Sequence, residues 1–239
     1  MSMIHYSIPG TPVEVAWSDR SDNDMATIAP GGEAHSLLAV VPARLAVLRL
    51  RQVHGADVAI DPEPGGSLIE ADAIVLANSG GCPVILTADC MAVALGSPEG
   101  LVGAVHAGWR GLVAGVLERA VETMYREGSS RVIAAIGPHI GTCCYEFSSE
   151  DMEPAVERFG LSIASRTTGG AVSMDLSAGA RQAVERAGAV LAFDSAQCTA
   201  CSGSFYSYRA QRTTSRQAMF AWDAAEGVRT VAQGRRPPA

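Results

Sequence analysis

The sequence predicts an α/β domain in which β-sheets are layered with helices, and three observations lead to this expectation. Short β-rich runs follow one another closely, other stretches have helical periodicity, and 48% of the 239 residues are apolar while 18% are charged. A chain of this length and composition is globular and can bury a substantial core. No internal repeat, charge block or long linker interrupts it, so we expect residues 1–239 to form a single domain.

Strands are expected at apolar runs that are rich in β-branched residues and bounded by turn residues. These runs are residues 45–50, 72–77, 83–88, 92–97, 101–107, 131–137, 190–195 and 218–224. Many of the runs are apolar at successive positions, which is typical of strands that are buried on both faces. We therefore expect sheets that are covered on both sides.

Helices are expected at three stretches. Apolar residues recur at i, i+3 and i+4 from Arg110 to Arg126, and Gly128 ends this pattern. A second helix is expected over residues 177–189, with Ser177 as its N-cap. A weaker candidate covers residues 149–159, where Pro154 either limits the start of the helix or kinks it.

The charge balance narrows the classes of partner. The formal net charge is -7, and all 18 basic residues are arginine because the chain contains no lysine. A negative balance argues against nucleic-acid and anionic-membrane partners, which are bound through clustered cations. The lack of lysine excludes Schiff-base chemistry, lysine-linked pyridoxal phosphate and a phosphate loop that ends in GK[ST]. We expect a small-molecule substrate, with any phosphate held by arginine or backbone amides.

The cysteines are interpreted through the expected location of the protein. The first ten residues lack the regions of a signal peptide and the apolar runs are too short to cross a bilayer, so we expect a cytoplasmic protein with reduced thiols. Cys198 and Cys201 form one CxxC, but no second pair follows at zinc-ribbon spacing. Burial near a turn is therefore favoured over a closed four-cysteine zinc site, and Cys143 and Cys144 are interpreted as structural. The oligomeric state is left open.

Three apolar runs end in polar clusters that each contain one metal-binding side chain. His54 lies in RQVHGAD, Cys90 in TADCM and His106 in AVHAGWRG. If these ends converge, two imidazoles and one thiolate suit Zn²⁺ and leave a fourth position open for water or substrate. On residue type alone, ordinary burial of these side chains is an equal alternative.

Six stretches of the sequence, in order, resemble the motifs of the YfiH family, also called laccase-domain or polyphenol-oxidase-like proteins. They lie between about residues 45 and 222 and are RQVHGADV, ADAIVL, TADCMAVAL, AVHAGWRGLVAG, AIGPHIGTCCYEF and FYSYRAQRTTSRQA. The resemblance implies a layered α/β fold that is shared with a group of cysteine hydrolases. It also implies a metal bound by His54, Cys90 and His106, and a substrate or phosphate contact by Arg209.

Several neighbouring residues allow two interpretations. Arg110 could hold an anion with the N-terminus of its helix or pair with a carboxylate, and Trp109 is favoured as a packing wall. Asp89 could transfer protons, orient a ligand histidine or cap a strand end, and Asp72 has the same alternatives. Of the family's N-terminal segment only Arg20 remains, and we retain it as a substrate-binding candidate.

The resemblance implies a zinc-dependent purine nucleoside phosphorylase that acts on adenosine, inosine, guanosine and methylthioadenosine and also deaminates adenosine. In this hypothesis Asp89 and Arg209 are catalytic, while Arg110 and Arg20 bind substrate. Zinc would lower the pKa of its bound water to about 7 and so serve the deamination.

Three other functions stay open. A copper-dependent polyphenol oxidase, with Cu²⁺ in place of zinc, ranks lower because a laccase needs more imidazoles than the five histidines without a His-x-His pair provide. A cysteine amidohydrolase that edits peptidoglycan precursors would use Cys90 as nucleophile and His106 as base. A binding module would have affinity for nucleosides without turnover.

Overall fold

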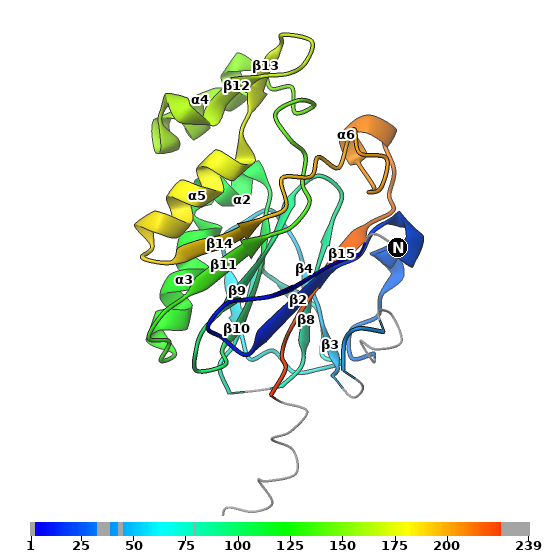
Figure 1. Ribbon diagram of the computed structural model, residues 1–239, viewed down its shortest axis with the longest axis vertical. Coiled ribbons are helices and arrows are strands. Elements are labelled where there is room, and N and C mark those ends of the chain that lie inside the picture. The colour runs from blue at the N-terminus through cyan, green and yellow to red at the C-terminus, as the bar shows by residue number, and fades with distance from the viewer. Residues whose placement is uncertain (1–2, 33–38, 43–44, 79, 226–239) are drawn as a thin grey trace, which may run out of the picture.

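The computed structural model describes residues 3–32, 39–42, 45–78 and 80–225, and two sheets dominate it (Figure 1). The five-stranded sheet has the order β1 (Ile4–Ser7), β2 (Val13–Trp17), β15 (Gln217–Asp223), β8 (Cys82–Thr87) and β3 (Val47–Leu48). The six-stranded sheet has the order β14 (Val190–Asp194), β11 (Ile133–Ile136), β9 (Met91–Gly96), β10 (Val102–Ala107), β7 (Ala73–Leu76) and β5 (Val58–Ile60). Two short pairs join β4 (Leu50–Arg51) to β6 (Ile69–Glu70) and β12 (Ala164–Arg166) to β13 (Val172–Met174).

Helices lie along one side of the six-stranded sheet, away from the five-stranded sheet (Figure 1). They are α2 (Trp109–Ala114), α3 (Val116–Arg126), α4 (Ser149–Phe159) and α5 (Leu176–Arg186), while the short α6 (Tyr208–Gln211) lies beyond the end of the sheets. Short 3-10 turns occur at η1 (Arg20–Asp22), η2 (Met25–Thr27) and η3 (Leu161–Ile163). Within the described ranges, none of the helices has the length and apolar character needed to cross a membrane.

The alternation of side chains along the central strands builds the layers. In β9, Met91, Val93 and Leu95 pack against the helices, whereas Ala92 and Ala94 face the five-stranded sheet. A further apolar cluster, which includes Phe220 of β15, covers the other face of the five-stranded sheet. The expected α/β fold with sheets covered on both sides is therefore confirmed. The single-domain organisation stays a prediction.

Three details differ from the sequence expectations. The helix expected over residues 110–126 is broken at Gly115, whose backbone is left-handed with φ 89°, so α2 and α3 are separate helices. The N-cap of α5 is Asp175, whose Oδ1 accepts a hydrogen bond from the Ala178 amide at 2.9 Å; Ser177 Oγ bonds His139 Nε2 instead. The run 45–50 divides between two sheets, with β3 in one and the start of β4 in the other.

Pro154 lies inside α4 and neither delays its start nor ends it. The helix begins at Ser149, after an N-cap at Ser148 whose hydroxyl accepts a hydrogen bond from the Asp151 amide, and it continues to Phe159. Pro154 is at the middle of this helix and removes one intrahelical donor, and the amphipathic packing of Met152 and Ala155 holds the helix in place.

Candidate metal centre

The three sequence-predicted donors converge at one end of the sheets. His54 follows β4, Cys90 directly precedes β9 and His106 lies within β10. Their ligand atoms all lie within 4.8 Å of one another, and Cys90 Sγ is 3.8 Å from His54 Nε2. Because His54 is exposed, Cys90 partly buried and His106 buried, the centre opens to solvent on the His54 side. Two imidazoles and one thiol around one point form a donor set that suits zinc or copper.

Unusual backbone conformations place two of these groups. His54 has φ 62°, and Asp89, which precedes Cys90, has φ 102°. Residues other than glycine rarely adopt left-handed backbone, and where they do the strain commonly occurs at functional sites. At Asp89 the backbone is tied to the loop after β11, because the Ile140 amide donates a hydrogen bond to the Asp89 carbonyl at 2.8 Å.

Gly108 leaves room for the donors. A Cβ at this position would lie 2.9 Å from both Cys90 Sγ and His54 Cδ2, so any side chain would occupy the space between them. The backbone of Gly108 itself, with φ -73° and ψ 167°, is accessible to other residues. Gly111 has a parallel role, because a Cβ there would lie 2.9 Å from the Gly55 carbonyl oxygen in the His54 loop. Both glycines of the HAGWRG motif are therefore explained by close approach.

Asp72 connects the two histidines. Its Oδ1 lies 2.8 Å from His106 Nδ1 and accepts a hydrogen bond from the His54 amide at 3.0 Å, while Oδ2 accepts from the Gly55 amide at 2.7 Å. Since a carboxylate only accepts, Nδ1 of His106 carries the proton in this contact and Nε2 is left to face the centre. Burial acts to raise the pKa of Asp72, but the His106 contact and the backbone amides outweigh it and lower that pKa. Of the alternatives left open for Asp72, the geometry favours orientation of a ligand histidine.

Cys90 and His106 shift each other's ionisation. Burial acts to raise the pKa of the Cys90 thiol, but the neighbouring His106 and His54 imidazoles lower it to about 6. Burial acts to lower the pKa of His106, but Cys90 and Asp72 raise it to about 9. Without a cation the two groups form a thiolate–imidazolium pair near neutral pH. A cation that binds all three donors must displace the proton on His106 Nε2.

A cavity of about 710 Å³ adjoins the three donors. Apart from the three donors, the charged residues of its lining in the described part of the chain are five arginines and one carboxylate: Arg49, Arg51, Arg110, Arg209, Arg216 and Asp89. Tyr145, Trp109 and Tyr208 contribute aromatic surface to the same cavity. A cationic cavity with aromatic walls in an otherwise acidic protein suits an anionic group attached to a flat ring system.

Asp89 and Arg209 are held together on one side of this cavity. Asp89 Oδ2 accepts a hydrogen bond from the Arg209 amide, and Oδ1 accepts one from Thr199 Oγ1, both at 2.7 Å. The Arg209 guanidinium lies 5.1 Å from the centroid of the Tyr145 ring, and its Nη1 donates to the Glu146 carbonyl at 2.6 Å. Among the described residues, no carboxylate lies within ion-pair distance of the remaining N–H groups of this exposed guanidinium.

The other two candidate arginines differ in position. Arg110 lines the cavity, and its guanidinium lies 4.5 Å from the centroid of the Trp109 ring. Trp109 in turn packs edge-on against Phe147 at a centroid distance of 5.5 Å, so it combines a packing contact with a place in the cavity wall. Arg20 stacks on Tyr206 at 5.2 Å and is not among the residues that line the cavity. A substrate contact by Arg20 stays a prediction.

Several residues that line the cavity were not identified as candidates from the sequence. Arg49 and Arg51 occupy alternate positions just before the His54 motif, and this spacing in an extended segment was the signal that could have identified them. No pattern in the sequence identifies Tyr145 as a cavity residue, because the motif GTCCYEF alone does not indicate that this loop folds back to the cavity. Arg216 lies in the SRQA segment, which departs from the pattern typical of the family that the sequence resembles.

Comparisons with known proteins agree with this architecture. Residues 21–224 match a family model described as multi-copper polyphenol oxidoreductase laccase. A purine nucleoside phosphorylase of Streptomyces coelicolor is 39% identical over 206 residues and 84% of each chain. Purine nucleoside phosphorylase YfiH of Escherichia coli is 37% identical over 178 residues and 72% of each chain.

Solved structures share the fold. A protein of Neisseria meningitidis has a TM-score of 0.77 and 24% identity over 93% of this chain and 99% of that one. YlmD from Geobacillus stearothermophilus has a TM-score of 0.77 and 22% identity over 93% of this chain and 96% of that one. The sequence relatives carry the names of enzymes that act on small molecules, which supports an enzymatic role here. The chain therefore belongs to the YfiH family of laccase-like proteins.

Proposed function

We propose that this chain is a zinc-dependent purine nucleoside phosphorylase that also deaminates adenosine. The observation that carries the proposal is the opening of the His54, Cys90 and His106 donor set into a cavity lined by five arginines. A volume of about 710 Å³ falls in the range typical of small-molecule sites. The names of the relatives support the same class of substrate.

The arginines supply the binding of phosphate that phosphorolysis requires. Phosphate must be bound and aimed at the C1′ carbon while the ribose gains positive charge. In a chain without lysine, Arg209 is the best placed donor because Asp89 and the Glu146 carbonyl fix its backbone and one end of its guanidinium. Asp89 therefore acts first by positioning Arg209, and proton transfer to a leaving purine is its second candidate role.

Tyr145 adds a neutral hydroxyl group, able to donate a hydrogen bond, to the cavity that adjoins His54, Cys90 and His106. Burial and the nearby Cys90 raise the pKa of the Tyr145 phenol far above its usual value, so its hydroxyl stays protonated at neutral pH. It can therefore donate to an oxygen of the ribose or phosphate without adding negative charge. A zinc ion held by the three donors would supply Lewis acidity toward a substrate oxygen or water.

The test is a phosphorolysis assay with purified, zinc-loaded protein, inorganic phosphate and inosine or adenosine, in which free base and ribose 1-phosphate are measured. We expect product that depends on phosphate, together with a large loss of activity in Cys90→Ser and Arg209→Ala. Arg131→Ala is the matched control, because this exposed arginine two residues before β11 lies outside the cavity. Absence of product from a folded protein that contains zinc would contradict the proposal.

A cysteine amidohydrolase is the second candidate, and the thiolate–imidazolium pair of Cys90 and His106 favours it. Tight metal binding and nucleophilic attack by the same sulfur exclude each other. Metal analysis separates the two functions: stoichiometric zinc that is lost in Cys90→Ser supports the phosphorylase. Turnover by metal-free protein that alkylation of Cys90 abolishes supports the amidohydrolase.

A multicopper oxidase fits the described residues less well. His5 Nε2 pairs with Glu14 at 2.9 Å, and His139 is bonded to Ser177 and the Gly137 carbonyl, so neither histidine joins the centre. His35 lies outside the described residues. The centre thus offers two imidazoles, too few for the copper cluster of a laccase.

A further inference from the structure

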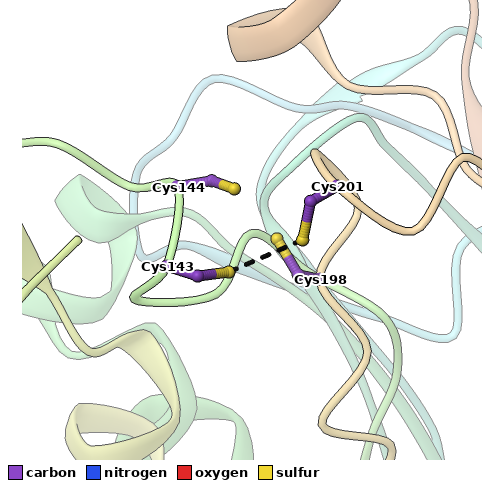
Figure 2. A group of neighbouring side chains, drawn as sticks. All are labelled: Cys143, Cys144, Cys198 and Cys201. Carbon is purple, nitrogen blue, oxygen red and sulfur yellow. Dashed lines mark hydrogen bonds between the residues drawn. The ribbon is translucent and has the colours of Figure 1, made fainter. Parts of the chain in front are cut away.

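A second group of metal-binding side chains lies apart from the cavity. The sulfur atoms of Cys143, Cys144, Cys198 and Cys201 all lie within 4.8 Å of one another. Figure 2 shows that the two pairs come from different loops and that their side chains point toward a common space; the dashed line marks the 3.6 Å contact between Cys143 Sγ and Cys201 Sγ. The spacing in sequence did not predict this, because the pairs are far apart in the chain and one of them is formed by adjacent residues.

Backbone contacts hold the two loops in register. The loop after β11 and the loop after β14 form a parallel bridge between His139 and Cys198, with the Thr199 amide on the His139 carbonyl at 3.0 Å. The Gly141 amide donates to Cys198 Sγ at 3.3 Å. A Cβ at Gly141 would lie 3.3 Å from Cys198 Cβ and 3.5 Å from Cys143 Sγ, so glycine permits the close approach. The four thiols are thus built into the crossing of two fixed loops.

The separations of the sulfur atoms suit one tetrahedral ion. With zinc–sulfur bonds of about 2.3 Å, the sulfurs of a tetrathiolate site lie about 3.8 Å apart. The observed cluster, with 3.6 Å for the contact of Cys143 and Cys201 and an upper limit of 4.8 Å for every pair, needs only small side-chain adjustments to reach this geometry. A disulfide would join two sulfurs and would leave the mutual approach of all four without explanation.

The local donors favour a thiolate at Cys198. The Gly141 amide donates a hydrogen bond to its sulfur at 3.3 Å, and the backbone amides of Ala200 and Cys201 also point to this sulfur. Amides that point at the first sulfur of a CxxC turn stabilise the charge that a metal ligand must carry. Three further thiols at this distance would repel one another if ionised, and a divalent cation removes that repulsion.

We propose that Cys143, Cys144, Cys198 and Cys201 bind a second zinc ion in a closed tetrathiolate site. The set of four sulfurs leaves no open position, so the role of this ion is structural and not catalytic. This inference does not depend on the reaction of the first centre.

The position of the cluster indicates what the ion stabilises. Tyr145 directly follows Cys144, and Thr199 directly follows Cys198. Tyr145 lines the cavity, and the Thr199 hydroxyl donates to Asp89, which in turn holds the Arg209 amide. The second ion therefore fastens the two loops that carry this wall of the cavity.

The experiment measures metal content and ligand type in the full chain, expressed with added zinc and purified without oxygen. We expect about two zinc ions in the wild type and about one in Cys143→Ser and in Cys201→Ser. Cys90→Ser, which affects the other centre, should retain about one ion, and X-ray absorption should show only sulfur around it. Cys82→Ala is the control, because this buried cysteine of β8 belongs to neither cluster, and it should retain both ions.

Three results would overturn the second site. The first is one ion in the wild type with mixed nitrogen and sulfur ligands. The second is unchanged zinc content in a folded Cys143→Ser. The third is an intact mass of the anaerobic protein that lacks two or four hydrogens, which would indicate disulfides. If the serine variants do not fold, cobalt substitution of the wild type still decides, because a tetrathiolate ion has an absorption spectrum distinct from that of a His₂Cys ion.

Discussion

At the residue scale, the first centre depends on the ionisation of Cys90 and His106. Each group is the main favourable influence on the charge of the other, so the thiolate is present well below the pH at which a free cysteine ionises. This has a direct consequence for reactivity, because only the thiolate attacks an alkylating reagent.

In metal-free protein, the alkylation rate of Cys90 by iodoacetamide should therefore rise through a midpoint near pH 6, where its pKa lies. Cys82, whose thiol is buried and has a pKa raised by burial, should stay unmodified over the same range. Peptide mapping by mass spectrometry measures both sites in one sample. A midpoint for Cys90 at pH 8 or above would show that the imidazoles do not stabilise its thiolate.

Gly108 permits a second prediction at this scale. Gly108→Ala should weaken zinc binding at the first centre by ~10-fold or more, because its Cβ would lie 2.9 Å from Cys90 Sγ and His54 Cδ2. Gly169→Ala is the matched control, since its Cβ would meet only Thr167 Oγ1 at 3.8 Å. Zinc affinity by competition with a chelator provides the measurement, and equal affinity in the two variants would contradict the steric explanation.

The convergence of His54, Cys90 and His106 could be expected because each side chain ends an apolar run and because the motifs resemble those of the YfiH family. On residue type alone, ordinary burial was an equal alternative, and the role of these residues as metal ligands stays a prediction. For Asp72 the sequence left three roles open: proton transfer, orientation of a ligand histidine and capping of a strand end. The choice among these roles depends on which histidine reaches its carboxylate. The sequence could not show that the Asp72 carboxylate contacts both the His106 ring and the backbone of the His54 loop. The contact with His106 joins residues 34 positions apart and depends on the pairing of β7 with β10.

At the element scale, the eight expected strand runs were predictable because they are apolar, short and bounded by turn residues. The sequence patterns did not identify β1, β2, β5, β6, β12 and β13, and they placed the helix ends less well than the expected strands. The break at Gly115 interrupts a stretch whose apolar periodicity continues on both sides. Periodicity therefore predicted one helix where tertiary contacts produce two. Arg158 of α4, which pairs with Glu118 at 2.6 Å, approaches the chain at this break.

The break makes Gly115 sensitive to substitution. Gly115→Ala should lower the free energy of unfolding by ~1–2 kcal/mol, the usual cost of left-handed backbone for a residue with a Cβ. Gly128→Ala provides the matched comparison, because it has φ 105° but no atom within 4 Å of the added Cβ. Urea denaturation of both variants isolates the added effect of the Arg158 Nη2 contact at 3.1 Å. A stability equal to the wild type in Gly115→Ala would contradict the predicted cost of a Cβ at this left-handed position.

At the scale of the whole molecule, neither the cavity nor the cysteine cluster could be predicted from the sequence, and the reason is the same for both. Each is assembled from loops that leave the sheets at distant points in the chain, and spacing along the sequence does not encode their meeting. The cysteines at 143 and 144 lie more than fifty residues from those at 198 and 201, although their sulfurs share one space. The layered fold was predictable because it follows from patterns within each segment.

The stability of the metal-free molecule should depend on pH through Cys90 and His106. The pKa of His106 is raised to about 9, so its contribution is present below its ordinary pKa of 6.5 and is lost as the pH rises through 9. The pKa of Cys90 is lowered to about 6, so its contribution is present above 9.0 and is lost as the pH falls through 6. These are one interaction seen from its two groups, so the pair is intact between about pH 6 and pH 9.

We expect the difference in unfolding free energy between metal-free wild type and metal-free Cys90→Ala to be largest inside this window and to decrease on both sides. Urea titrations at a series of pH values, with both proteins treated with the same chelator, provide the measurement. A difference that does not change from pH 5 to pH 10 would show that the pair contributes nothing to folding.

The shared carboxylate of Asp72 has a further consequence for the proposed metal-bound form of the protein. One buried side chain orients the His106 ring and also holds the His54 loop through backbone amides. When acid protonates the Asp72 carboxylate, the contact with His106 and the contacts with the backbone of the His54 loop weaken together. The two imidazoles then take up protons as the metal ion leaves them. Release of the bound metal ion on acidification should therefore be a steep, cooperative transition, and not the gradual titration of three independent ligands.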